Sequence, residues 1–181
     1  RDESIRFDAI LGRNALGGLT NKGEIARIIA ARLAPGGRLA LVETLSRRAQ
    51  RLHDLVPMET LEAPLRMRLI EAEEAIYADA ENPQVAWDEV DLESFFTDAG
   101  LTKIEVHCES LHNQRHITPQ QLAHWFNPGG EKRHTYANYL GQYLDAKELH
   151  TVRRLFEREL ANKTVPWSTT LTFLFAQATD K

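Results

Sequence analysis

The sequence predicts an α/β fold, one sheet interrupted by helical inserts. Short apolar runs with strand character recur along the chain, and the first two flank an amphipathic helix. The most strand-like run, at residues 168–178 (STTLTFLFAQA), comes near the end. A strand–helix–strand unit of the size seen at the start requires a parallel pair with a right-handed crossover. We therefore expect about four strands separated by helices.

The first strand–helix–strand unit spans the first quarter of the chain. Residues 5–11 (IRFDAIL) predict a buried strand, and residues 12–18 (GRNALGG) predict a loop. From Thr20 onward the apolar residues keep the spacing of one helix face, at Ile25, Ile28, Ile29 and Leu33. The Pro-Gly-Gly at 35–37 ends that helix, and residues 38–43 (RLALVE) predict the second strand.

The middle of the chain is helical. Residues 46–79 are interrupted by Pro57 and Pro64, which predicts two or three helices with an apolar seam of Leu65, Leu69, Ala72 and Ile76. Asp91 is expected to cap a further helix, and Gly100 to end it.

A third strand and a second helical block follow. Residues 102–108 alternate like a half-buried strand. Thr118 and Gln121 form a capping box with Pro119 at the first helical position, predicting a helix to about Phe126.

The rest of this block is predicted as a loop and two helices. The loop covers residues 127–133, and a short aromatic helix carries Tyr136, Tyr139 and Tyr143. Asp145 with Glu148 caps the last helix. We expect a single domain over 1–181, with helical inserts at about 46–87 and 112–161.

Composition narrows the class of protein. The chain has 181 residues, 43% hydrophobic and 27% charged, which excludes collagen-like and disordered chains. A net charge of −4 gives no whole-domain field favouring nucleic acid. Cys108 is the sole cysteine, so no internal disulfide forms and a reducing, cytoplasmic location is expected. Neither a membrane span nor a signal peptide is recognisable, and the start at Arg1 suggests a piece of a longer chain.

The segments FDAILGRNAL and LAPGGRLALVETLSR, separated by a helix, resemble the second half of a class I S-adenosylmethionine-dependent methyltransferase. The resemblance implies a partial Rossmann-like sheet in which residues 5–11 form the fourth strand and 38–43 the fifth. Residues 101–108 would be the sixth strand, and 168–178 the seventh, which is antiparallel. The family's glycine-rich turn and the acid after its second strand are missing here, so the S-adenosylmethionine site is incomplete in this chain.

The inserts carry a narrower resemblance. The segments AEEAIYAD, RHITPQQLAHWF and NKTVPWSTTLTFL resemble a methyltransferase domain fused behind a clamp-loader-like AAA ATPase of replication-associated recombination. This implies a parent ATPase domain as partner, and contact with nucleic acid only indirectly. Chemotaxis-receptor methyltransferases also place Arg-Asn after an "FD" strand, but their later segments differ.

Candidate ligand-binding residues lie where the strands end. Ligands of open α/β sheets bind beyond the carboxyl ends of the strands, so Arg13 and Asn14 are predicted to bind the cofactor. Arg13 would pair with a carboxylate, and Asn14 would present its amide. The alternative is that both satisfy loop backbone. Glu43 ends the next strand and is predicted to border the substrate, while Ser46 is expected to be the N-cap of the following helix.

Aromatic side chains crowd the inserts. Tyr77 and Trp167 are predicted to cover a substrate, although such rings could equally fill small helical cores. Trp125 and Tyr139 fit the core role better. No catalytic base is identified among the four candidates, which are Glu43, Glu73, Glu74 and His116.

Two of these candidates, Glu73 and Glu74, are predicted to be solvated carboxylates on a helix surface with a structural role or none. No metal site is expected, because His112 and His116 fall in a predicted loop without converging ligands. Lys147, Arg153, Arg154 and Arg158 make one helix basic, and such residues could touch phosphates, but acidic neighbours favour a mixed solvated face.

Two functions from different classes remain. The chain is part of a methyltransferase that is active when an N-terminal half completes it, or it is a non-catalytic methyltransferase-like binding or oligomerisation module. In either case the strand at residues 7–11 would have a bare outer edge. Bare edges attract another strand, so we expect homo-oligomerisation through this edge, or its cover by an insert.

Overall fold

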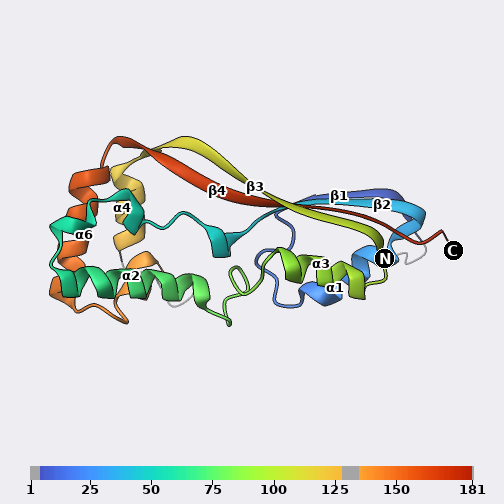
Figure 1. Ribbon diagram of the computed structural model, residues 1–181, viewed down its shortest axis with the longest axis horizontal. Coiled ribbons are helices and arrows are strands. Elements are labelled where there is room, and N and C mark those ends of the chain that lie inside the picture. The colour runs from blue at the N-terminus through green and yellow to red at the C-terminus, as the bar shows by residue number, and fades with distance from the viewer. Residues whose placement is uncertain (1–4, 128–134, 181) are drawn as a thin grey trace. The chain divides into compact units, whose positions relative to one another are not determined.

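A computed structural model describes residues 5–127 and 135–180 (Figure 1). The chain divides into two compact units. The sheet unit comprises Arg1–Ala49, Asp79–Leu111 and Thr169–Lys181, and the helical unit comprises Gln50–Ala78 and His112–Ser168. The single domain with two inserts stays a prediction.

One four-stranded sheet has the order β1-β2-β4-β3. Its strands are β1 (Phe7–Arg13), β2 (Leu33–Thr44), β3 (Thr102–Ile117) and β4 (Lys163–Gln177). β1 runs parallel to β2, with Leu11 opposite Ala40, and β4 runs antiparallel to β2, with Phe175 opposite Ala40. The α/β class, the four strands and the antiparallel last strand are confirmed.

β3 and β4 are longer than predicted. The start of β3 contacts the end of β4, where Thr102 Oγ1 donates to Gln177 O at 3.2 Å. The end of β3 lies by the start of β4, where Asn162 N donates to Ile117 O at 2.8 Å. The two strands are therefore antiparallel. His112 and His116, predicted in a loop, lie in β3; residues 109–114 are exposed on both faces, so no apolar alternation marks them as strand.

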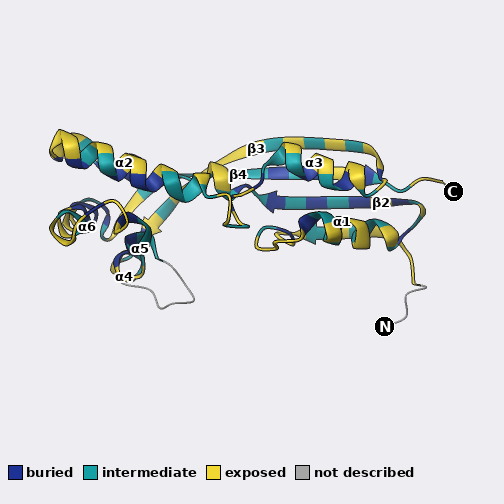
Figure 2. Ribbon diagram, turned by 90° about the horizontal axis from the view of Figure 1, so that it is seen from below, coloured by how far each residue is buried: buried dark blue, intermediate teal, exposed yellow. Residues whose placement is uncertain are grey.

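Two helices cover one face of the sheet in the sheet unit: α1 (Lys22–Ala31) and α3 (Glu89–Asp98) (Figure 1). Alternate residues of β2 and β4 point to them, and β2 carries a row of buried positions in Figure 2. The shared core contains Ala26, Leu39, Leu41, Trp87, Leu92, Phe96, Leu174 and Ala176.

The N-cap of α3 corrects a prediction. Asp88, rather than Asp91, caps the helix, and its Oδ1 accepts from Val90 N at 2.9 Å and Asp91 N at 3.3 Å. Asp91 is the third residue of the helix, and its side chain accepts a hydrogen bond from Asp88 N at 3.0 Å. Asp88 and Asp91 thus form a capping box. Both residues are acidic, and the first of them is the N-cap.

The Pro-Gly-Gly segment was predicted to end the first helix, but it lies inside β2. The helix α1 ends earlier, at Ala31, and Leu33 is the first residue of β2. Gly36 has φ +71, a left-handed conformation that glycine adopts without strain. A Cβ on Gly37 would lie 2.8 Å from Ala34 O and 3.0 Å from Phe7 O. Glycine therefore permits the close approach of β1 at the point where the strand register shifts.

The helical unit packs four helices around its own core. They are α2 (Ala63–Ala78), α4 (Pro119–Phe126), α5 (Tyr136–Leu140) and α6 (Ala146–Leu160). Buried residues from all four meet, including Leu65, Leu69, Leu122, Phe126, Leu140, Val152, Phe156 and Leu160. The capping boxes of Thr118 with Gln121 and of Asp145 with Glu148 are confirmed.

Residues 46–62 form three short 3₁₀ turns instead of helices: η1 (Ser46–Arg48), η2 (His53–Leu55) and η3 (Met58–Thr60). Ser46 does not act as an N-cap, because it lies within η1 and Leu45 precedes it without a side-chain cap. Most of the predicted loop at 127–133 lies outside the described residues. Among those described, no helix is both long and apolar enough to cross a membrane.

Candidate functional site

The carboxyl ends of β1 and β2 meet and form the strand-end site, which consists of Arg13, Asn14, Glu43 and Thr44. Arg13 lies opposite Val42 in the parallel register, so the last residues of both strands lie at one edge of the sheet. The structure thus brings together three of the five residues predicted from the sequence. Parallel strands present loops and ligands at this end.

Glu43 holds the loop that leaves β1. Its side chain is fully buried, and its two carboxylate oxygens accept from Ala15 N at 2.7 Å and Leu16 N at 3.2 Å. A buried carboxylate is destabilising unless it is hydrogen-bonded, and these two donors satisfy it. Glu43 is therefore a positioning residue for the loop, and its contact with a substrate stays a prediction.

Asn14 fixes the same loop from its other side. It has φ +49, a left-handed conformation that asparagine tolerates better than most residues. Its Oδ1 accepts from both Thr44 N and Thr44 Oγ1 at 3.0 Å. The side-chain oxygen satisfies the strand end, as the alternative interpretation expected, while no described residue accepts from the Nδ2 amide.

Like Asn14, Arg13 is exposed at the site. It is the last residue of β1, directly before the fixed loop, and no described residue forms an ion pair with it. A guanidinium held at a strand end can bind a carboxylate or a phosphate through two hydrogen bonds.

Lys22 was not singled out from the sequence. It begins α1, yet its side chain is buried, and its Nζ donates to Leu19 O and Pro83 O at 2.6 Å each. The Nζ also lies 5.5 Å from the centre of the Trp87 ring. Burial lowers the pKa of Lys22, and the negative charge of Glu43 partly opposes this shift. A lysine in the first turn of a helix carries no sequence signal for such burial.

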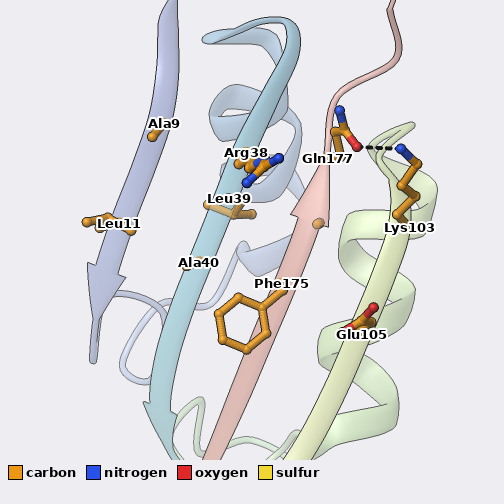
Figure 3. A pocket seen from close by; sticks show the side chains of 10 residues that line it. Ala9, Leu11, Arg38, Leu39, Ala40, Lys103, Glu105, Phe175 and Gln177 are labelled. Atoms are coloured by element: carbon orange, nitrogen blue, oxygen red, sulfur yellow. Dashed lines mark hydrogen bonds between the residues drawn. The ribbon is translucent and has the colours of Figure 1, made fainter.

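The face of the sheet opposite α1 and α3 is open and partly apolar. It holds a hollow of about 560 Å³ over β1, β2 and β4, flanked by β3 (Figure 3). Leu11 is 80% exposed and Phe175 is 42% exposed, and both flank Ala40 in register. On the same face His107 stacks on Phe173 with 4.9 Å between ring centres. β1 is also the outer strand of the sheet, so this open face continues to a free edge.

Tyr77 and Trp167 belong to the helical unit, and the strand-end site belongs to the sheet unit. The guanidinium of Arg51 lies 3.7 Å from the centre of the Tyr77 ring, and that of Arg115 lies 4.3 Å from the centre of Trp167. Burial raises the pKa of Tyr77 to about 12, with a further contribution from Glu73. Each ring therefore stacks with a cation of its own unit, and cover of a substrate stays a prediction.

Glu73 is fully buried, which corrects its prediction as a solvated carboxylate. It accepts from Leu52 N, from His53 N at 3.0 Å, from His53 Nδ1 at 2.9 Å and from Tyr136 Oη at 2.7 Å. The hydrogen bond to Glu73 raises the pKa of His53. The burial of Glu73 could have been predicted from its spacing in the sequence. It is four residues after Leu69 and therefore lies on the same buried face of α2.

The remaining candidate bases lie apart from one another. Glu74 forms a two-point ion pair with Arg51, with distances of 2.7 and 3.0 Å. His116 is exposed on β3, with Nδ1 at 3.4 Å from Thr164 Oγ1. Among the described residues no group of three or more histidine, cysteine or acidic side chains could hold a metal ion.

No family model and no curated protein matches the chain. Solved structures that resemble it include a candidate methyltransferase of Bacillus halodurans, at 12% identity and a TM-score of 0.45 over 96% of this chain and 65% of that one. Phosphoethanolamine N-methyltransferase 2 of Haemonchus contortus, solved with S-adenosylhomocysteine, has 12% identity and a TM-score of 0.41 over 96% of this chain. This chain spans 65% and 34% of the lengths of these two proteins. The YcgJ protein of Bacillus subtilis has 12% identity and a TM-score of 0.45 over 99% of this chain and 69% of that one.

Proposed function

We propose that this chain is the carboxyl-terminal half of a class I S-adenosylmethionine-dependent methyltransferase, active when a first half completes its sheet. The observation that carries the proposal is the strand-end site. Two parallel strands end side by side there, and the loop between Arg13 and Leu16 is fixed by Glu43 and Asn14. A fixed loop beyond strand ends is where open α/β sheets bind ligands.

The strand directions support this assignment. In the numbering that the sequence resemblance implies, β1, β2, β4 and β3 are the fourth, fifth, seventh and sixth strands. The resemblance requires the seventh strand to be antiparallel, and β4 is antiparallel to β2. The last strand, β4, lies between β2 and β3. This order is unusual for a simple parallel sheet, because strands that are neighbours in sequence are usually neighbours in space.

The residues at the strand ends fit part of S-adenosylmethionine. Arg13 would bind its carboxylate, and the Asn14 amide would donate to it or to the substrate. When bound, the cofactor supplies the methyl group. The glycine turn and the acid that holds ribose hydroxyls would come from the first half, because this chain contains neither.

The missing half would pack against β1 and the open face. The free edge of β1 can accept a parallel strand, and the exposed Leu11 and Phe175 can receive an apolar helix face. Homo-oligomerisation through residues 7–11 would use the same edge. From the resemblance of the inserts, we further propose that the parent protein carries an AAA ATPase domain of replication or recombination.

Titration calorimetry tests the proposed function. S-adenosylmethionine would be titrated into this chain and into the protein extended upstream by one half-domain. We expect binding by the extended protein only. Arg13→Ala should weaken that binding about tenfold through loss of a charge-assisted contact, and Arg27→Ala, an exposed arginine of α1, should leave it unchanged. Failure of the extended protein to bind would refute the proposal.

The burial of two candidate bases favours the alternative function, a non-catalytic binding module. Glu43 is enclosed by its own loop, and Glu73 by the core of the helical unit. Complementation of DNA repair by a parent protein carrying Arg13→Ala with Asn14→Ala distinguishes the two. Full complementation supports the module, and loss of complementation with normal protein levels supports the methyltransferase.

A further inference from the structure

A row of basic side chains, two arginines and one histidine, runs along α6 in the helical unit. His150, Arg154 and Arg158 are four residues apart, so they lie on one stripe of the helix with a rise of about 6 Å between neighbours. We call these three residues the α6 cation row. They line a hollow of about 380 Å³ together with Thr60, Leu61, Thr151 and Leu155.

The backbone beneath the row is firmly held. The opposite stripe of α6 is buried in the core through Val152, Phe156 and Leu160. The N-terminus of α6 is closed by a capping box in which Asp145 accepts from Glu148 N at 2.9 Å. The helix backbone therefore keeps the three residues at their spacing without a ligand.

Arg154 is the arginine of the row that pairs with no described acidic side chain, whereas Arg158 forms an ion pair with Glu159. The described lining of the hollow includes no carboxylate, and no described residue forms a hydrogen bond or ion pair with Arg154. Arg158 uses its Nε to bind Glu159 at 2.7 Å, and its terminal amino groups have no described partner. Arg153 on the same helix forms the same kind of ion pair with Glu157, at 2.7 Å, but does not line the hollow.

The lining predicts the chemistry of the ligand. Thr60 Oγ1 and Thr151 Oγ1 already donate to backbone carbonyls at 2.8 and 2.9 Å, so the guanidinium groups are the available donors. Two guanidinium groups one helical turn apart suit a compact group with several oxygens and more than one negative charge. Leu61 and Leu155, which are both buried, contribute the apolar part of the lining.

We propose that the α6 cation row is a binding site for phosphate groups. The phosphate is carried by a free phosphorylated anion or by the backbone of a single-stranded nucleic acid. This site lies in the helical unit and does not depend on the methyltransferase proposal. It also gives the basic residues of α6 a role other than a mixed solvated face.

The test is a titration of the whole chain followed by backbone amide NMR shifts, with two ligands in separate arms: sodium pyrophosphate and an unphosphorylated single-stranded oligonucleotide. We expect saturable shifts within 146–160 in at least one arm. Arg154→Gln with Arg158→Gln should weaken binding about tenfold or more, and the matched control Arg153→Gln should change it less than about twofold. Binding of pyrophosphate would assign a free anion, and binding of the oligonucleotide alone, weakening steeply with salt, would assign nucleic acid.

A second variant keeps the test decisive if the double variant does not fold. Thr60→Glu introduces a carboxylate into the hollow from η3, where Thr60 is exposed, and should abolish the shifts by repelling the ligand. The proposal is overturned if neither ligand shifts α6 in a saturable way. It is also overturned if Arg153→Gln weakens binding as much as the double variant, or if sodium glutarate binds as tightly as pyrophosphate.

Discussion

At the scale of single residues, two buried carboxylates organise the two units. Glu43 fixes the loop after β1, and Glu73 joins η2, α2 and α5 by accepting from His53 and Tyr136. The sequence shows both as ordinary glutamates. Their burial depends on backbone donors contributed by distant segments, which the sequence does not reveal. The positions of Arg13 and Asn14 at the strand end were predicted correctly. The burial of Glu73 and of Lys22 was not predicted.

Glu43→Gln should destabilise the chain by about 2 kcal/mol, because one of the two loop N–H groups would face an amide donor instead of a carboxylate oxygen. Urea unfolding measures the difference. The control is Glu105→Gln, an exposed residue on the open face, which should change the unfolding free energy by less than about 0.5 kcal/mol. Equal effects from the two variants would contradict the positioning role of Glu43.

The contact between His53 and Glu73 should make stability depend on pH. The hydrogen bond to Glu73 raises the pKa of His53 above the ordinary value of 6.5, with Asp54 and Glu74 adding smaller contributions. His53 therefore binds its proton more tightly in the folded chain than in the unfolded chain. The stability gained from this is at its maximum below the pKa of His53 in the unfolded chain. It is lost as pH rises through the pKa of His53 in the folded chain.

The stability difference between the natural chain and His53→Gln should therefore shrink as pH increases above about 6.5. Urea unfolding of both proteins at several pH values between about 5.5 and 8.5 measures it, and His112→Gln, an exposed histidine, is the control. A difference that grows with pH would show that His53 is not bound as a cation to Glu73.

At the scale of elements, local signals determined several boundaries and tertiary pairing determined the others. The capping box of Thr118 and Gln121 predicted the start of α4, because such a box is complete within four residues. The extensions of β3 and β4 were missed, since the polar pairing of residues such as His112 leaves no alternating pattern. Residues 46–62 lack the apolar spacing of a helix and form 3₁₀ turns held by their neighbours.

Asp88→Ala should destabilise the chain by about 1 kcal/mol, because it removes the oxygen that accepts from two N–H groups at the start of α3. Thermal or urea unfolding measures the loss. Asp98→Ala, at the other end of the same helix, serves as the control and should be neutral or slightly stabilising, since an acid there opposes the helix dipole. A larger loss from Asp98→Ala would contradict the cap assignment.

The two faces of the sheet should respond differently to substitution. Leu41→Ala on the covered face should cost about 3 kcal/mol of stability, because Leu41 is fully buried beneath α1 and α3. Leu11→Ser on the open face should cost less than about 0.5 kcal/mol in the isolated chain, since the side chain is already exposed. The same Leu11→Ser should weaken assembly with an upstream half, as measured by analytical ultracentrifugation. Unchanged assembly would show that the open face is not the docking surface.

At the scale of the whole molecule, the sheet unit has the parallel pair and the antiparallel last strand that the sequence resemblance implies. Under the proposed function, its open side would receive the other half. The fold class followed from apolar periodicity and from the order of the elements. The hydrogen bonds of the strand-end site could not follow in the same way, because they join segments that meet only in the tertiary structure. The bare outer edge of β1 was nevertheless predicted from the resemblance, in which the fourth strand pairs with a strand of the missing half, and among the described strands β1 is an outer one.

The central claim is most directly tested by a crystal structure of the extended protein with S-adenosylmethionine. We expect a parallel strand paired with the outer edge of β1. We also expect the cofactor beyond the carboxyl ends of β1 and β2, with its carboxylate within hydrogen-bonding distance of Arg13. A cofactor bound elsewhere, or an outer edge of β1 that stays unpaired, would contradict it.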